Sequence, residues 1–276
     1  MRPVISIGAT SRRGRNAVSE GTKRLKLTIA YDGQPWMGWQ SLPNGRGVQD
    51  QIERAFHLVT GAQTRVRGSG RTDAGVHALG QVAHVDVDAT LQLTPEAWLN
   101  ALNARLHPSI RVTGCEDAAP DFHARFDTVG KIYRYRIWRP RILDPFEAGR
   151  AWHVHGPLDE GRLRECAQIV TGTHNFSRLS ANRGGISDEE RREDEARVTR
   201  TISRTDITVA EGVISIEYEG DGFLYKMARM ITGSMVHVAR GRESVRWFRS
   251  LLEEPAGLKS NQAAPADGLY LVRVLY

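Results

Sequence analysis

The feature that most limits how this chain can fold is the segment of residues 68–87, GSGRTDAGVHALGQVAHVDV. Residues 64–67 before it are typical of a strand, and residues 82–87 alternate in the way expected of a half-buried strand. The polar residues between these strands therefore lie in a turn that is anchored at both ends. Binding and catalytic residues are often found in such turns.

Arg71 and Asp73 lie two positions apart in this turn, so a locally extended backbone would place them on the same side. A carboxylate in a partly dry cleft stays ionised when a cation or hydrogen bonds stabilise it. An ionised Asp73 could then serve as a nucleophile or a base. The alternative is a surface turn with an exposed salt bridge, because Asp, Gly and Arg are common in turns.

Composition places the chain among ordinary globular proteins. The 276 residues are 40% hydrophobic and 25% charged, which is enough for one large domain or two. Lys and Arg number 38 against 32 Asp and Glu, and the net charge of +6 is consistent with a polyanionic partner or with a mildly basic enzyme. No window reaches the roughly 20 apolar residues of a membrane span. Cys115 and Cys166 form no CxxC pattern, so we expect a cytoplasmic protein without a zinc cluster or disulfide framework.

Hydrophobic periodicity predicts two similar units, at residues 23–117 and 118–276, each of order β-α-β-β-α-β. In the first unit, the predicted strands are 25–31, 64–67, 82–87 and 110–115, and the predicted helices are 48–59 and 94–106. In the second, the predicted strands are 131–138, 199–209, 212–218 and 269–276, and the predicted helices are 158–170, 223–239 and an additional 243–252. Two such units predict an α+β protein with mainly antiparallel sheets joined around a central cleft.

Two polar segments are expected to lie outside the core. Residues 1–22 contain four arginines among small residues and are typical of a disordered basic arm. Residues 178–198 are densely charged and predict an exposed or mobile loop. A lid that contacts RNA is the alternative for this loop, although its run of acidic residues would repel phosphate.

The strand at 131–138 carries tyrosines on one face and arginines on the other. Tyr133 and Tyr135 share the first face, and Arg134 and Arg136 share the second. A tyrosine beside the cleft could stack on a nucleobase while arginines neutralise phosphates. Core tyrosines with solvated arginines are the alternative. Arg125 lies just before this strand, in the aromatic segment 122–126.

Arg229 lies in an otherwise apolar helical segment. A buried arginine either finds a carboxylate or extends its head to the surface, and Asp73 is the natural candidate for a partner. His77 and His84 near Asp73 raise the question of a metal site, which we do not expect because no third ligand stands at a recognisable spacing. The alternation of its strand predicts that His84 faces solvent.

Five motifs together resemble one enzyme family. GRTDAGVHALGQVAH at 70–84 resembles the signature of the TruA-type tRNA pseudouridine synthases, and four more of their motifs follow in the same order: DFHARF, KIYRYRIW, GFLYKMARMITGS and DGLYLVRV. The resemblance spans residues 24–276. It implies the pseudouridine synthase fold and isomerisation of uridine to pseudouridine at positions 38, 39 and 40 of the tRNA anticodon arm. It also implies a homodimer that binds tRNA in basic clefts and needs no cofactor or metal.

The same resemblance implies roles for individual residues: Asp73 as the catalytic aspartate, Arg71 in base flipping, Tyr133 stacked on the target base, Arg229 keeping the aspartate charged, and Leu269 as an apolar pocket wall. We also expect His77 and Arg125 to contact the substrate. Tyr133 is a further candidate for accepting the proton from uracil C5, although an ordinary phenol is a poor base near neutral pH.

Two other classes of function are compatible with parts of the sequence. A non-catalytic RNA-binding or RNA-folding module could use the same basic cleft, but it has little use for an acid near phosphate. A glycosidase-like hydrolase could use Asp73 as nucleophile, but it would need a second carboxylate nearby. For the isomerase, the sequence leaves open whether Asp73 attacks the ribose, attacks the uracil ring or helps to form a glycal.

Overall fold

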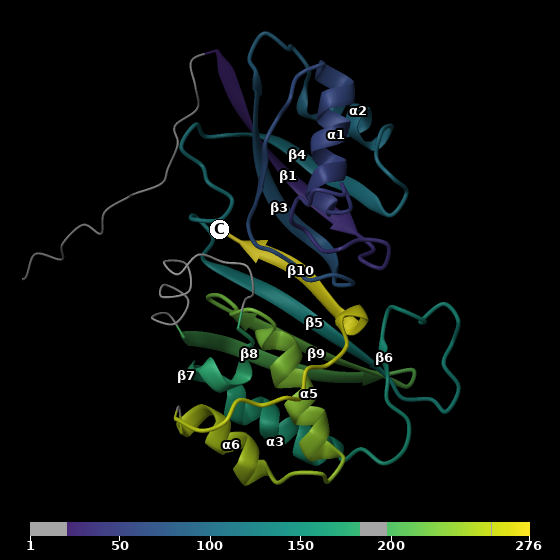
Figure 1. Cartoon of the computed structure of the whole chain (residues 1–276), viewed down its shortest axis with the longest axis vertical. Coiled ribbons are helices and arrows are strands. Elements are labelled where there is room, and N and C mark those ends of the chain that lie inside the picture. The colour runs from purple at the N-terminus through teal and green to yellow at the C-terminus, as the bar shows by residue number, and fades with distance from the viewer. Residues whose placement is uncertain (1–20, 183–197, 255) are drawn as a thin grey trace, which may run out of the picture.

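The fold is built on one continuous sheet, seen in a computed structural model that describes residues 21–182, 198–254 and 256–276. Its strand order is β4-β1-β3-β10-β5-β9-β8-β7, with β2 paired to β3 and β6 paired to β5 (Figure 1). The strands have the following bounds: β1 Thr22–Tyr31, β2 Val66–Gly68, β3 His77–Asp88, β4 Ile110–Ala118, β5 Gly130–Trp138, β6 Trp152–His153, β7 Gly172–Asn175, β8 Thr199–Ala210, β9 Val213–Gly220 and β10 Leu269–Leu275.

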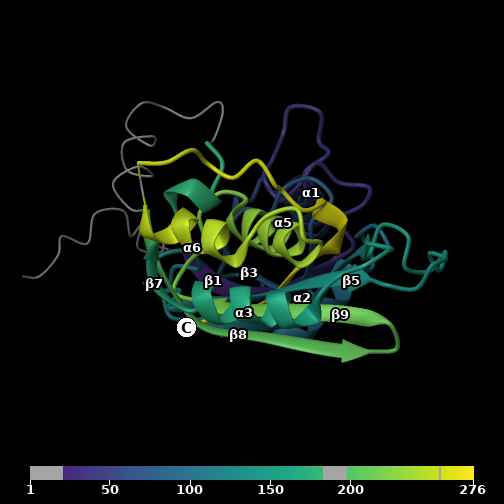
Figure 2. The ribbon, with the colours of Figure 1, turned by 90° about the horizontal axis from the view of Figure 1, so that it is seen from below.

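Helices pack against this sheet in two groups, one for each half. The helices are α1 Val48–Thr60, α2 Pro95–Asn103, α3 Glu160–Val170, α5 Met227–Ala239 and α6 Val245–Glu253, with short 3₁₀ turns η1 Ser177–Leu179 and η2 Ala266–Gly268. In Figure 2, α5 and α6 lie on one side of β8 and β9. The predicted α+β class is confirmed, and the first half has the predicted order β1-α1-β2-β3-α2-β4.

The apolar periodicity of the sequence accounts for the core of the first half. Leu25, Leu27 and Ile29 alternate along β1 and are fully buried. On the helices above them, the rings of Phe56 and Trp98 pack with centroids 5.5 Å apart. Burial of large aromatic and branched side chains of this kind is the main favourable term in folding.

The two halves join through the last strand of the chain. β10 lies between β3 and β5, and it pairs with β3 in parallel through only Tyr270–His77 and Leu271–Ala78. On its other edge it pairs with β5 in antiparallel register, with Leu271 opposite Tyr133. Because β3 begins at His77, directly after the glycine-rich turn, the junction places that turn beside the start of β10.

One prediction about the first half is wrong. His84 is 2% exposed rather than solvent-facing, because the segment before β5 covers this face of β3. The backbone N–H of Ala124 donates a hydrogen bond to His84 Nδ1 at 3.1 Å. Burial, reinforced by the neighbouring His123, lowers the pKa of His84 to about 3, so the ring is neutral.

The two segments expected to be polar and exposed fall largely outside the described residues. Of the basic arm, Thr22 is the first residue of β1, and residues 1–20 are not described. Of the charged loop, residues 183–197 are not described, whereas Arg178 is buried and donates hydrogen bonds to the carbonyls of Ser250, Glu254 and Leu258. Arg178 thereby caps the carboxyl end of α6. No helix in the described ranges has the length and apolar character needed to cross a membrane.

Candidate active site

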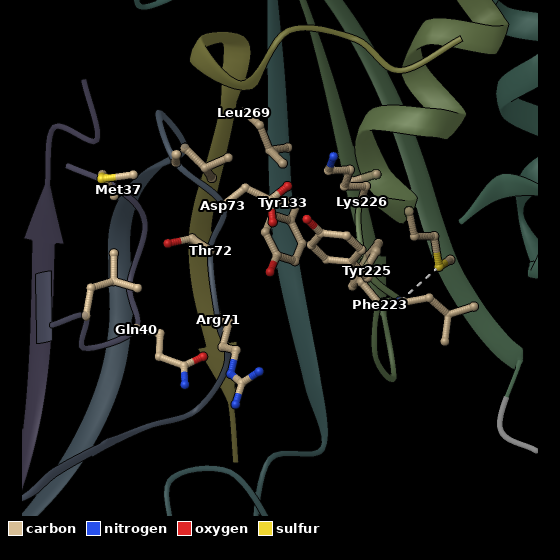
Figure 3. A pocket seen from close by; sticks show the side chains of 16 residues that line it. Met37, Gln40, Arg71, Thr72, Asp73, Tyr133, Phe223, Tyr225, Lys226 and Leu269 are labelled. Carbon is tan, nitrogen blue, oxygen red and sulfur yellow. Dashed lines mark hydrogen bonds between the residues drawn. The ribbon is translucent and has the colours of Figure 1, made fainter. Parts of the chain in front are cut away.

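A cavity of about 400 Å³ opens where the two halves meet. Its walls come from the loop before α1, the turn between β2 and β3, strand β5, the start of β10 and the segment before α5 (Figure 3). This volume is typical of ligand pockets in proteins. Asp73 is the only carboxylate among the described residues that line it.

Asp73 and Arg229 form an ion pair at this cavity. Arg229 Nη1 donates to Asp73 Oδ2 at 3.0 Å, and the two side chains are only 15% and 20% exposed, in that order. Arg229 Nε donates to the carbonyl of Ala264 at 2.8 Å, which orients the guanidinium. The prediction that the arginine of this apolar helix pairs with Asp73 is confirmed. A guanidinium held in this way fixes the orientation of the carboxylate and balances its charge.

The loop before α1 supports the turn that carries Asp73. The N–H of Trp39 donates to the carbonyl of Thr72 at 3.1 Å. Gly38 adopts a φ of 91°, and a Cβ atom there would lie 2.5 Å from the same carbonyl oxygen. The hydroxyls of Tyr31 and Thr72 share a buried hydrogen bond of 2.8 Å. At position 38, only glycine allows the two backbones to approach this closely. Together, these contacts leave the Asp73 carboxylate facing the cavity (Figure 3).

Tyr133 presents its ring and hydroxyl to the cavity from β5. It is 8% exposed, and its ring meets that of Phe223 edge to face with centroids 4.8 Å apart. Figure 3 shows Tyr133 beside Asp73, with Tyr225 next to it. Burial raises the pKa of Tyr133 above its ordinary value, and Tyr31 and Asp73 add to this effect. The hydroxyl is therefore protonated near neutral pH and can donate a hydrogen bond.

Leu269 and Arg71 complete the set of predicted residues that line the cavity. Leu269 is the first residue of β10 and is 6% exposed. Arg71 is exposed, and its side chain extends away from Asp73 in Figure 3. The structure thus brings together five predicted residues from four separate parts of the chain: Arg71, Asp73, Tyr133, Arg229 and Leu269.

His77 and Arg125 are not among the residues that line this cavity. His77 is 2% exposed; its Nδ1 accepts a hydrogen bond from the N–H of Gly33, and its Nε2 lies 3.0 Å from the carbonyl of Gly149. Burial lowers the pKa of His77, so the ring is neutral and Nε2 carries the proton. Arg125 is exposed, with its guanidinium 5.7 Å from the Phe126 ring centroid. Contact of these two residues with substrate stays a prediction.

The sequence analysis missed three residues that precede α5. Phe223, Tyr225 and Lys226 line the cavity, whereas helical periodicity placed residues 223–226 inside the helix. The helix begins at Met227, because Lys226 adopts a left-handed backbone conformation and the N–H of Met227 donates to the carbonyl of Leu224. Apolar spacing cannot reveal such a turn, since Phe223 and Tyr225 line the cavity and do not form part of a helix face.

The described residues contain no cluster of three or more His, Cys, Asp or Glu side chains arranged to hold a metal ion. The single lining carboxylate also argues against the hydrolase alternative, because glycosidases of the usual type need two carboxylic acids. The cavity therefore offers one carboxylate, one guanidinium fixed beside it and three aromatic rings. This set can hold a planar base and stabilise one ionised acid next to it.

Comparison with known proteins gives a consistent answer. The sequence model of the tRNA pseudouridine synthase family matches residues 27–127 and 166–276, which include Asp73, Arg229 and Leu269, whereas Tyr133 lies between the two matched segments. A tRNA pseudouridine synthase A of Akkermansia muciniphila is 45% identical over 92% of this chain and 95% of that protein. A protein of the same name from Latilactobacillus sakei subsp. sakei is 38% identical over 92% of this chain and 99% of that protein. The chain belongs to the tRNA pseudouridine synthase family.

Proposed function

We propose that this protein isomerises uridine to pseudouridine in tRNA, with Asp73 as the catalytic carboxylate. The Asp73–Arg229 pair carries the proposal, because it fixes one ionised acid in an aromatic-lined cavity. Relatives that cover nearly the whole chain bear the name tRNA pseudouridine synthase A, which supports the same activity. Family resemblance further supports uridines 38, 39 and 40 of the anticodon arm as targets, a homodimeric assembly and a cytoplasmic location.

The reaction breaks the bond from ribose C1′ to uracil N1 and forms one from C1′ to C5. The target uridine must first leave its base stack, and exposed Arg71 in the cavity wall would assist this step. Tyr133 then stacks against the uracil, and Leu269 closes the opposite apolar side. These walls keep the freed uracil in place while it rotates to present C5. One carboxylate suffices for attack on the ribose, attack on the uracil ring or assistance to a glycal.

The C5 proton leaves at the end of the reaction. Its acceptor must lie near the rotated uracil, and the Tyr133 ring lies beside Asp73 in Figure 3. Because burial raises the pKa of Tyr133, this tyrosine accepts the proton only if its own proton moves to another group in the same step. The Asp73 carboxylate is the nearby group with that capacity.

Release of tritium from tRNA labelled at uracil C5 tests the proposal directly, since C5 loses its hydrogen when it bonds to C1′. Wild type should release tritium, and Asp73→Asn should release none while binding tRNA within about tenfold of wild type, or about 1.4 kcal/mol. Asp121→Asn removes the same charge from an exposed position and should react as wild type does. Mapping of the product then shows which uridines are modified.

The outcomes separate the alternatives. Normal turnover by Asp73→Asn would overturn the assignment of the carboxylate. Tight binding without tritium release by wild type would favour the non-catalytic RNA-binding module. Release of free uracil would favour the hydrolase.

A further inference from the structure

Lys226 combines three features that are each energetically unfavourable for a lysine. Its backbone is left-handed, with φ 58° and ψ 9°, and Glu211 is the only other non-glycine residue with positive φ in the described ranges. Glycine or asparagine adopts this conformation more easily than lysine does. Strained backbone of this kind is concentrated at functional sites, so it is a reason to look for a role of the side chain.

The second feature is the position of Lys226 at the amino end of α5. Lys226 is the N-cap residue of this 13-residue helix, and the first turn contains no acidic residue. The amino end of a helix carries partial positive charge, so a lysine there is repelled and an anion is attracted. The fold thus places two sources of positive potential together.

The third feature is the lack of a neutralising partner. The Lys226 ammonium lies 5.2 Å from the ring centroid of Tyr225, and no carboxylate of the described residues forms an ion pair with it. Arg229, by contrast, is already paired with Asp73. Lys226 lines the same cavity, on the side of Asp73 away from Arg71 in Figure 3.

We propose that Lys226 binds a backbone phosphate of the RNA next to the uridine that occupies the Asp73 cavity. This inference rests on the proposed function. A uridine extruded from its stack stays attached to a phosphate on each side, so an anion enters the cavity mouth together with the base. A bound phosphate would interact favourably with both the ammonium and the end of α5. Lys226 is therefore a positioning residue, because it holds the nucleotide and does not take part in bond exchange.

The salt dependence of tRNA binding tests this role, because each phosphate contact adds to the slope of log Kd against log salt concentration. Lys226→Asn removes the charge and suits the left-handed backbone, whereas Lys226→Arg retains the charge. We expect Lys226→Asn to reduce the slope by about one unit and Lys226→Arg to leave it unchanged. Lys23→Gln, which removes a lysine of β1 that does not line the cavity, is the matched control and should also leave the slope unchanged.

A wild-type slope in folded Lys226→Asn would overturn the inference, and so would an equal reduction in Lys23→Gln. Lys226→Gly serves as a second charge-free variant if the asparagine variant does not fold. Because binding is measured without turnover, the result is independent of tritium release. A wild type that releases tritium while Lys226→Asn keeps the wild-type slope refutes this inference alone, whereas a wild type that binds tRNA without release refutes the proposed function.

Discussion

Arg229 Nη1 donates a hydrogen bond to Asp73 Oδ2 at 3.0 Å, although the two residues lie 156 positions apart in the sequence. Asp73 stands on a turn of the first half, and Arg229 stands in the first turn of α5 in the second half. The ion pair therefore depends on the packing of the halves against each other. Substitutions of either residue of the pair should therefore lower the catalytic rate more than they lower the stability of the fold.

Arg229→Met should lower the single-turnover rate by about 100-fold or more, which corresponds to about 2.7 kcal/mol or more. The substitution keeps much of the apolar stem but leaves a mostly buried carboxylate without the cation that pairs with it and holds it in place. The single-turnover rate of Arg229→Lys should lie between those of this variant and wild type, because lysine keeps the charge but loses the planar geometry of the guanidinium. Rapid-quench tritium release measures these rates.

The control for this prediction is Arg249→Met on α6, whose arginine is half exposed and lies 3.7 Å from Glu253. Exposed pairs of this kind contribute at most about 0.5 kcal/mol, so rate and stability should stay near wild type. A wild-type rate in Arg229→Met would show that Asp73 does not need the guanidinium.

Gly38→Ala should disrupt the support of the Asp73 turn, whereas Gly45→Ala should not. Both glycines have positive φ, 91° and 68°, but a Cβ atom at Gly38 meets the Thr72 carbonyl and one at Gly45 meets open space. We expect Gly45→Ala to lose about 1 kcal/mol of stability from backbone strain, with an unchanged rate. Gly38→Ala should lose about 3 kcal/mol and at least tenfold in rate, because the Thr72–Asp73 backbone must move.

Denaturant unfolding and single-turnover kinetics on the two glycine variants give both quantities. Equal losses of stability in the two variants would show that the close approach of Gly38 to the Thr72 carbonyl adds nothing to the cost of the substitution. A stable, fully active Gly38→Ala would mean that the loop before α1 does not position the catalytic turn.

Tyr133 should show no ionisation in the pH dependence of the reaction between about pH 7 and pH 9. Its pKa lies above the ordinary value near 10 because the ring is buried. If the unliganded enzyme needed a Tyr133 phenolate, the rate would rise about tenfold per pH unit in this range. A rise of that size in wild type, absent in Tyr133→Phe, would contradict the prediction.

His84 should make the protein less stable in acid. Its folded pKa of about 3 lies below the ordinary value of 6.5, so the unfolded chain binds more protons between these limits. The contribution of neutral His84 to stability is complete above about pH 6.5 and decreases as pH falls toward 3. At pH 5 the loss is about 2 kcal/mol.

His84→Asn tests this prediction, because its side-chain oxygen can still accept a hydrogen bond from the N–H of Ala124. The variant should be less stable than wild type at neutral pH, through lost packing, but its free energy of unfolding should depend less on pH between about 6.5 and 4. If the free energy of unfolding depended on pH in the same way in both proteins, the acid sensitivity would come from other titratable groups.

The sequence by itself determined the α+β class, most of the helices and strands, and the turn that carries Asp73. Period-two alternation in residues 25–31 identified β1, and five motifs in order identified the family. These features are local, because periodicity records which face of an element is apolar and a motif records which residues a backbone segment presents. Arg229 was expected to need a carboxylate for a similar reason, since a cation in an apolar helix must be compensated.

Only the tertiary structure decided how these parts meet. The position of β10 between β3 and β5, the burial of His84 and the turn that starts α5 at Met227 all follow from packing between distant segments. The alternation along β3 assigns His84 to the face of the strand that is expected to meet solvent, but a loop folded over that face buries the side chain. Local sequence carries no information about such contacts, because sheet order and loop coverage depend on the combined surfaces of both halves.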